Sequence, residues 1–390
     1  MKKNSNLLIL ALLTIGMGMT SCEGALDDIL GEWSRPTKNP SETPESPASP
    51  LATPLTLEVL SEGAGTIVIK SPKVNMKYSK NGATPTTITS TADVTIDVTK
   101  GDKVAFYGDG TSITKYNGTI IAGGTAELKV YGNIMSLLDE TGFATATTQL
   151  ATNQTFTQLF YGNDKLKDAN GLLLPAETLT TFCYSQMFSG CTALIAAPAL
   201  PAKTLETYSY ANMFQGCTSL TTAPELPATT VPACCYQSMF YGCTSLTTAP
   251  ALPATTIGGS CYLYMFRDCT ILTTAPELKA TTLAMSCYEG MFYGCSSLTT
   301  APELKATTLA EECYQSMFNG CTSLNAVTCL ATNITATNCT KDWLNGAGTD
   351  ASVTSRTLHI KTGQDPADTN WKLSTSGDGS SKKWTAVADR

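Results

Sequence analysis

Histidine is almost absent from this chain of 390 residues, which contains only His359. That scarcity excludes most histidine-based catalytic triads and every metal site that needs several histidines. The chain also has no Cys-x-x-Cys pair and no basic run, and its formal net charge is −7. These absences argue against a zinc site and against nucleic acid as a partner, and we expect no cofactor.

Long apolar runs are scarce as well. The one clear run, Leu7 to Met19, follows Lys2 and Lys3. As a helix it would reach only ~20 Å, which is short of the ~30 Å apolar core of a bilayer. The segment therefore predicts a signal peptide over residues 1–21, and no later stretch predicts a membrane span.

The end of this segment reads Met-Thr-Ser-Cys at positions 19–22. It resembles the lipobox of bacterial lipoproteins, although Met19 stands where that family usually has Leu. The resemblance implies that the thiol of Cys22 carries a lipid; an ordinary cleaved signal is the alternative. Acidic Asp27, Asp28 and Glu32 loosely resemble the signal that sends Bacteroidetes lipoproteins to the outer face. This implies an outer-membrane protein, lipid-anchored and exposed on the cell surface.

Residues 22–54 are rich in Pro, Ser and Thr, which predicts an unfolded tether. Residues 55–132 instead alternate apolar and polar side chains, as in Val94-Thr-Ile-Asp-Val98, with turn pairs such as Asn81-Gly82 between the runs. This pattern predicts a small all-β, sandwich-like domain, with spacing or binding as its possible roles. A connector is expected over residues 133–154.

The central part of the chain repeats itself every 26 residues. The pair Met-Phe begins at positions 187, 213, 239, 265, 291 and 317, a worn copy has Trp343-Leu344, and an earlier one has Leu159-Phe160. Such a unit cannot bury its apolar face alone, so the repeats predict a solenoid of stacked coils over residues 155–346. Residues 347–390 are expected to cap its end.

Within each unit, Cys-Tyr-x-x-Met-Phe has apolar residues at helical spacing and predicts a short helical turn that ends at the following Gly. Ser-Leu-Thr-Thr-Ala predicts a short strand. A proline then follows in five units, and because it has no N–H we expect it to limit the strand ladder there. These prolines are Pro198, Pro224, Pro250, Pro276 and Pro302.

The unit Met-Phe-x-Gly-Cys-Thr-Ser-Leu-Thr-Thr-Ala-Pro-Glu-Leu-Pro resembles that of BspA-like leucine-rich-repeat surface proteins. The resemblance covers residues 155–346 and implies a leucine-rich-repeat-like solenoid with a short strand and a helical turn per unit. It also implies adhesion to host proteins or other cells. The present units are longer than the common family unit, and proline stands where that unit often has a β-branched residue.

Two ladders of cysteines recur at the repeat distance, one through Cys191 and Cys217, the other through Cys183 and Cys235. Disulfides between neighbouring coils are possible outside the cell. We favour buried free thiols, because Ser209 interrupts the second ladder and an identical residue in every copy offers no alternating pairs.

Positions that vary between copies are expected to face water. After Met-Phe they are Ser189, Gln215, Tyr241, Arg267, Tyr293 and Asn319. We expect binding of a host extracellular protein or a glycan, with Tyr241, Arg267 and Tyr293 as contact residues, because aromatic and Arg side chains dominate binding hot spots. A structural, self-assembling role is the alternative. A carbohydrate-active enzyme is disfavoured, since no catalytic residue stands out, and ice binding through the repeated Thr-Thr pairs has still less support.

Overall fold

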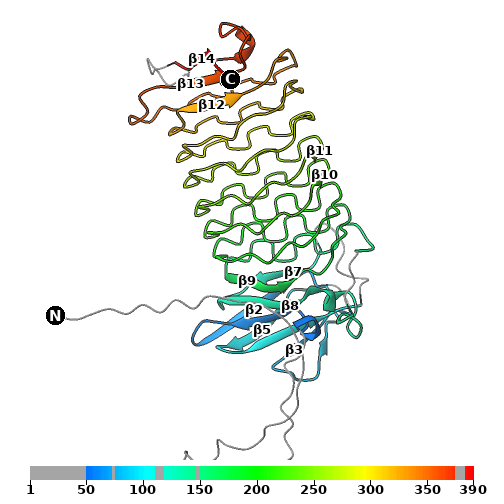
Figure 1. Cartoon of the computed structure of the whole chain (residues 1–390). Helices are drawn as coiled ribbons and strands as arrows, with labels where there is room; N and C mark the ends of the chain where they lie inside the picture. The colour runs from blue at the N-terminus through cyan, green and yellow to red at the C-terminus, as the bar shows by residue number, and fades with distance from the viewer. Residues whose placement is uncertain (1–49, 73–74, 110–117, 146–149, 374–382) are drawn as a thin grey trace, which may run out of the picture. The chain divides into compact units, whose positions relative to one another are not determined.

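The computed structural model describes residues 50–72, 75–109, 118–145, 150–373 and 383–390 (Figure 1). The predicted signal peptide, Cys22 and the tether up to residue 49 lie outside these residues. Within them the structure consists mostly of strands and turns, with short 3-10 helices and no α-helix. The described residues contain no helix long and apolar enough to cross a membrane.

The N-terminal part forms two sheets whose strands alternate buried and exposed side chains. Its elements are η1 (Pro50–Ala52), β1 (Thr56–Val59), β2 (Ala64–Lys70), β3 (Lys77–Lys80), β4 (Thr86–Thr87), β5 (Val94–Thr99), β6 (Lys103–Tyr107), β7 (Ile120–Gly123), β8 (Leu128–Asn133) and η2 (Ile134–Leu137). One sheet has the order β4-β3-β6-β1-β8-β9 and the other β5-β2-β7. All pairs among β1–β8 are antiparallel, and their inward side chains, such as Leu57, Ile67 and Phe106, are fully buried.

The repeats begin on the edge of the larger sheet. Strand β9 (Leu166–Leu173) belongs to the first coil and pairs with β8 in parallel. Later coils stack on it in parallel, and the only further strands among the repeats that the structure describes are β10 (Thr230–Val231), β11 (Thr256–Ile257) and β12 (Ala326–Cys329). Figure 1 shows the stacked coils between β9 and β12. They form a repetitive, solenoid-like body.

The predicted helical turn is wrong. Over residues 182–190, amides of even-numbered residues donate to the next coil, for example Tyr184 N to Ser209 O at 2.9 Å. Amides of the intervening residues donate three residues back within the coil, as Met187 N does to Tyr184 O at 3.3 Å. No amide of this stretch donates four residues back, as an α-helix would require. The segment is a row of consecutive β-turns bonded to the next row, here called the turn side of the coil.

The turns need a left-handed residue every fourth position. In one coil these residues are Phe182, Gln186 and Gly190, with φ of 60°, 56° and 74°. A positive φ at the third residue is what a type II turn requires. Two inward residues then alternate with two outward ones, so that Met187 and Phe188 are buried while Gln186 and Gly190 are half-buried. This period of four resembles the 3.6-residue period of a helix, which explains the error.

The inward residues of the turn side stack on their counterparts in the neighbouring coils. Phe214, Phe240 and Phe266 are fully buried, with ring centroids 5.7 Å apart from one coil to the next. A ladder of buried tyrosines runs beside them, as Tyr236 and Tyr262 show with centroids 5.8 Å apart. Offset stacking of this kind adds to the burial of apolar area. The core of each coil is therefore completed by its two neighbours.

The described cysteines, Cys183 to Cys339, are all free thiols, and nearly all are buried. In one ladder each thiol donates to a phenylalanine carbonyl of the preceding coil, as Cys243 Sγ does to Phe214 O at 3.2 Å. Burial raises the pKa of the Cys243 thiol to about 12. Ser209, which replaces cysteine in the other ladder, lies 3.2 Å from Cys235 Sγ through its hydroxyl.

The strand predicted in each unit is continuous in only some of the coils. In the coils that carry the five prolines, it is reduced to isolated parallel bridges, such as Ala196 with Thr222 and Thr222 with Thr248. True strands occur where the proline is replaced, at β9 with Asn170 and at β12 with Thr328. A residue without an N–H cannot donate to the next coil, so these prolines interrupt the ladder. We call this part of the coil the proline side.

The C-terminal residues continue the parallel stack. β12 pairs with β13 (Thr357–Ile360), which pairs with β14 (Thr385–Ala388). The 3-10 helix η3 (Thr369–Trp371) places Trp371 against Trp343, with ring centroids 6.4 Å apart. Trp343 Nε1 donates to Trp371 O at 2.8 Å. Both indoles are buried, so this segment covers the apolar interior of the last repeats.

Candidate functional site

The three residues predicted as contact residues lie together on the turn side. Arg267 occupies the same position in its coil as Tyr241 and Tyr293 in the preceding and following coils. The Cζ atom of Arg267 lies 5.2 Å from the ring centroid of Tyr241 and 4.5 Å from that of Tyr293. These separations are within the range of a cation–π interaction. The three residues therefore form a cluster, in which all three side chains are half-buried and not freely exposed.

A third tyrosine completes the surroundings of Arg267. The Cζ atom of Arg267 lies 5.1 Å from the ring centroid of Tyr264, which belongs to the same coil. Tyr264 Oη donates to Glu289 Oε1 at 3.4 Å, and Gln315 Nε2 donates to the same oxygen at 3.1 Å. Partial burial, with the nearby Glu289 carboxylate as the next cause, raises the pKa of Tyr264. The phenol therefore stays protonated and remains a hydrogen-bond donor at neutral pH.

The cation of this cluster is only partly neutralised. Arg267 Nε lies 3.5 Å from Asp268 Oδ2, close enough for an ion pair. That nitrogen is nevertheless buried without a hydrogen-bond partner, so the contact is electrostatic and not a well-formed hydrogen bond. A buried donor without a partner costs about 1–3 kcal/mol. The arrangement holds the guanidinium by ring contacts more than by directed bonds.

Two glycines of the next coil make room for this cluster. A Cβ atom on Gly290 would lie 2.2 Å from Tyr264 Cε1, and one on Gly294 would lie 2.1 Å from Asp268 Oδ1. Both glycines follow their partners by one repeat of 26 residues. Asp268 itself has φ 58° where every other Met-Phe copy has Gly. Gly294 is thus the ordinary residue of its position, whereas Gly290 is particular to its coil and matches the Tyr264 ring of the coil before it.

We call Tyr241, Tyr264, Arg267, Asp268, Glu289 and Tyr293 the arginine cluster. Sequence reasoning missed Tyr264, Asp268 and Glu289, because the expected helical turn placed their side chains wrongly. A signal was present in Asp268, which replaces the recurrent glycine, and in Gly290, which stands where the Met-Phe units otherwise have a larger residue. Such breaks in a repeat indicate positions that stacking alone does not explain.

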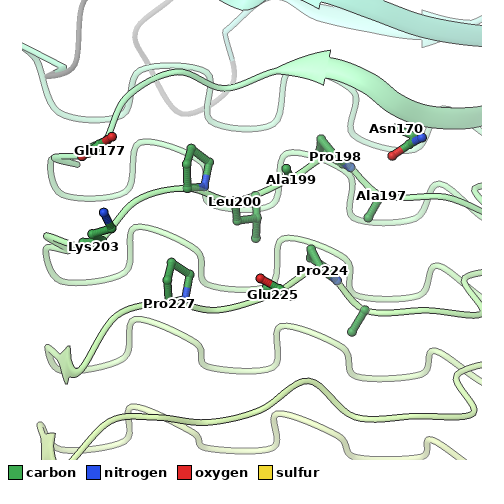
Figure 2. A pocket seen from close by; sticks show the side chains of 12 residues that line it. Asn170, Glu177, Ala197, Pro198, Ala199, Leu200, Lys203, Pro224, Glu225 and Pro227 are labelled. Carbon is green, nitrogen blue, oxygen red and sulfur yellow. The ribbon is translucent and has the colours of Figure 1, made fainter. Parts of the chain in front are cut away.

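The proline side carries a different feature, a series of shallow hollows. One of them, about 550 Å³, extends over three successive coils (Figure 2). Figure 2 shows Pro198 and Pro224 on successive coils, with Asn170 toward one end and Glu177 and Lys203 toward the other. Hollows of about 370 and 350 Å³ recur beside Pro250 and Pro302. The hollows beside Pro198 and Pro250 present mainly Ala, Leu and Pro, whereas the one beside Pro302 is lined mostly by polar residues of its own coil and of the coil of β12.

The described residues contain no group of three or more His, Cys, Asp or Glu side chains that could hold a metal ion. Glu311 and Glu312 lie in a variable part of a repeat, and Glu312 Oε2 accepts a hydrogen bond from Ser286 Oγ at 3.0 Å. His359 Nδ1 lies 2.9 Å from Asp389 Oδ2 in the C-terminal sheet. Neither group is part of the arginine cluster.

Comparison with known proteins gives no assignment. No family model matches the chain, and neither the curated proteins nor the solved structures include a significant match. The arginine cluster must therefore be interpreted from its own geometry.

Proposed function

We propose that this chain is a cell-surface binding protein that engages a host extracellular protein or a glycan through the turn side of its repeats. In this proposal Cys22 carries the lipid anchor, the protein is displayed at the outer membrane, and residues 22–54 act as a tether. The repeats would be a variant of the leucine-rich-repeat solenoid, in which a row of β-turns lines the turn side. The two N-terminal sheets would be a sandwich-like spacer.

The observation that carries this proposal is the arginine cluster. Three aromatic rings and one cation meet at a half-exposed place, on coils whose other positions repeat closely. Tyr and Arg are the residues most enriched at binding hot spots, where they combine a large contact area with hydrogen bonding. Gly290, which replaces a larger residue of the repeat, leaves room for the Tyr264 ring, as a retained feature would require.

The test uses the soluble chain from Glu23 to Arg390, screened against panels of matrix proteins and glycans. Saturable binding is expected for at least one ligand. A triple variant, Tyr241→Ala with Arg267→Ala and Tyr293→Ala, should weaken it at least tenfold, since each hot-spot residue contributes more than about 1 kcal/mol. The matched control changes Ser189, Gln215 and Asn319, in the same column, to Ala.

Full binding by the triple variant would refute this placement. Concentration-dependent self-association in light scattering, with no ligand in either panel, would instead support a structural surface component. Turnover of a glycan, lost on a single carboxylate change, would indicate an enzyme.

A further inference from the structure

The arginine cluster belongs to a longer series of outward aromatic residues. Six successive coils each present at least one aromatic side chain on the turn side. In chain order these are Tyr161, Phe182, Tyr208, Tyr241, Tyr264 and Tyr293. Tyr161 is 45% exposed and the other five are half-buried, whereas the tyrosines of the inner ladder, such as Tyr236, are buried. We call this series the aromatic track.

Direct contacts connect parts of the track. The rings of Phe182 and Tyr208 lie 4.5 Å apart at an interplanar angle of 4°. Both residues have a positive φ, at the turn position that points away from the core. We call this pair the Phe182–Tyr208 platform; its inner ring faces contact each other, so a ligand meets its edges and outer faces. The second platform is the arginine cluster, where three rings contact one guanidinium.

The dimensions favour an extended ligand. Neighbouring coils are joined by backbone hydrogen bonds of β type, which implies a spacing of ~4.8 Å. Five steps from the coil of Tyr161 to that of Tyr293 therefore cover ~24 Å along the stack. The rings occupy three different positions of the repeat, so a linear chain would cross the coils obliquely to contact rings of both platforms, and weak contacts along one ligand reinforce each other.

Charge and hydrogen-bonding groups define the ligand further. Beside the rings lie amides and carboxylates, including Gln186, Gln315, Asp268 and Glu289. At the arginine cluster, Arg267 contributes +1 while Asp268 and Glu289 contribute −1 each, which leaves −1. A polyanion is therefore disfavoured. A sugar ring offers C–H groups on its faces and hydroxyls at its edge, and it fits both the rings and the flanking polar groups.

We propose that the aromatic track binds a neutral linear polysaccharide that crosses the coils obliquely, with the Phe182–Tyr208 platform and the arginine cluster as two subsites. The inference rests on the proposed binding function and names its ligand class. It assigns a contact role to Phe182 and Tyr208, which do not touch Arg267. A proline-rich peptide could also pack on aromatic rings, but it would leave most of the flanking amides and carboxylates unused.

The experiment measures binding of the soluble chain to neutral linear glucans, mannans, galactans and xylans, with a polyuronate, heparin, a proline-rich peptide and matrix proteins beside them. Binding to at least one neutral polysaccharide is expected. Affinity for its oligosaccharides should rise with chain length until the track is filled and should then level off. Phe182→Ala and Tyr208→Ala should each weaken binding roughly tenfold, as the loss of a hot-spot ring does.

A second variant pair tests the geometry without removing a ring. Gly290→Ala would push the Tyr264 ring from its place, because the new Cβ would meet Tyr264 Cε1 at 2.2 Å. Gly320→Ala is the matched control. The φ of Gly320 is also left-handed, at 74°, but the atoms nearest to a Cβ added there, which include Gly294 Cα, lie 3.6 Å away. Both variants carry the same kind of backbone strain. Only Gly290→Ala should weaken saccharide binding, and thermal melts would check that both chains fold.

The outcomes separate the two proposals. Binding to a matrix protein or to the proline-rich peptide alone, lost in Arg267→Ala, would overturn the saccharide inference and leave the binding function standing. Polysaccharide binding that is unchanged by Phe182→Ala with Tyr208→Ala would overturn the track. Binding to no probe at all would overturn the inference together with the proposed function.

Discussion

The turn side and the proline side of the same coil are held together in different ways. On the turn side, alternate amides donate to the next coil, and rings stack at about 5.7 Å in every coil from Phe188 to Phe318. On the proline side, only isolated bridges connect the middle coils, and hollows open beside the prolines. Strands β9 and β12 form in the coils where Asn170 and Thr328 replace the proline. The amide of Asn170 itself donates to Asp168 Oδ1 at 2.8 Å, so it is the absence of proline, and not an added bond to a neighbouring coil, that accompanies β9.

The largest expected effect is the removal of a ring from the turn side. Phe240 is fully buried between Phe214 and Phe266, so Phe240→Ala should lower the free energy of unfolding by about 3–5 kcal/mol. Leu252→Ala, on the proline side, should cost about 2–3 kcal/mol, because the coils there can relax into the space. Urea denaturation followed by circular dichroism measures both. Equal losses would contradict the proposed difference between the two sides.

Alkaline pH should act mainly through the turn side. Burial raises the pKa of the Cys243 thiol from 9.0 to about 12, so its contribution to stability is complete below pH 9 and is lost as the pH rises toward 12. Ionisation of each such thiol in the unfolded chain can lower the free energy of unfolding by up to about 1.4 kcal/mol per pH unit in that window. Cys243→Ala should flatten the decline in stability between pH 9 and 12 by up to this amount.

Urea midpoints at several pH values give the slope for that comparison. Cys234→Ala is the control, since Cys234 is half-exposed and lies outside the two buried ladders. A slope that is unchanged in Cys243→Ala would show that buried thiols do not govern alkaline stability.

The smallest effect is expected from restoring an N–H on the proline side. Pro250→Thr copies the residue found at position 328 in β12. The new hydrogen bond should add about 1 kcal/mol to the free energy of unfolding. Removal of the proline makes the unfolded chain less restricted and should lower that free energy by about 0.4–1 kcal/mol, so the two effects nearly cancel. Stability should therefore change by less than about 1 kcal/mol, while the new amide at 250 becomes protected from hydrogen exchange. Exchange at the rate of an open loop would refute this account of the prolines.

Much of the fold could be predicted because it depends on local pattern. Strict alternation around Val94–Val98 predicted a strand where β5 lies, and the 26-residue spacing of Met-Phe predicted stacked coils. The row of turns could not be read in the same way. Inward pairs such as Cys183-Tyr184 and Met187-Phe188 recur every four residues, and only the hydrogen bonds distinguish that period from a helical one.

The candidate site was predictable in part for a related reason. Tyr241, Arg267 and Tyr293 share one position in the repeat, so stacking in register brings them together whatever the local backbone is. Tyr264 and Glu289 occupy other positions, and their contact with the cluster depends on the turns. The C-terminal strand β14 was missed because it follows the last recognisable copy and shares none of its sequence.

The pairing of Tyr264 with Gly290 limits how such an array can lengthen or shorten. Most coils offer the same surfaces to their neighbours, so duplication or loss of one unit would leave the stack intact. The ring of Tyr264 lies where a Cβ atom of the next coil would stand, and Gly290 leaves that place open, whereas Gly294 recurs in the other units and adds no constraint. To keep the ring in this place, the two units must be copied or lost together. Within an otherwise interchangeable series, this junction fixes where the arginine cluster stands.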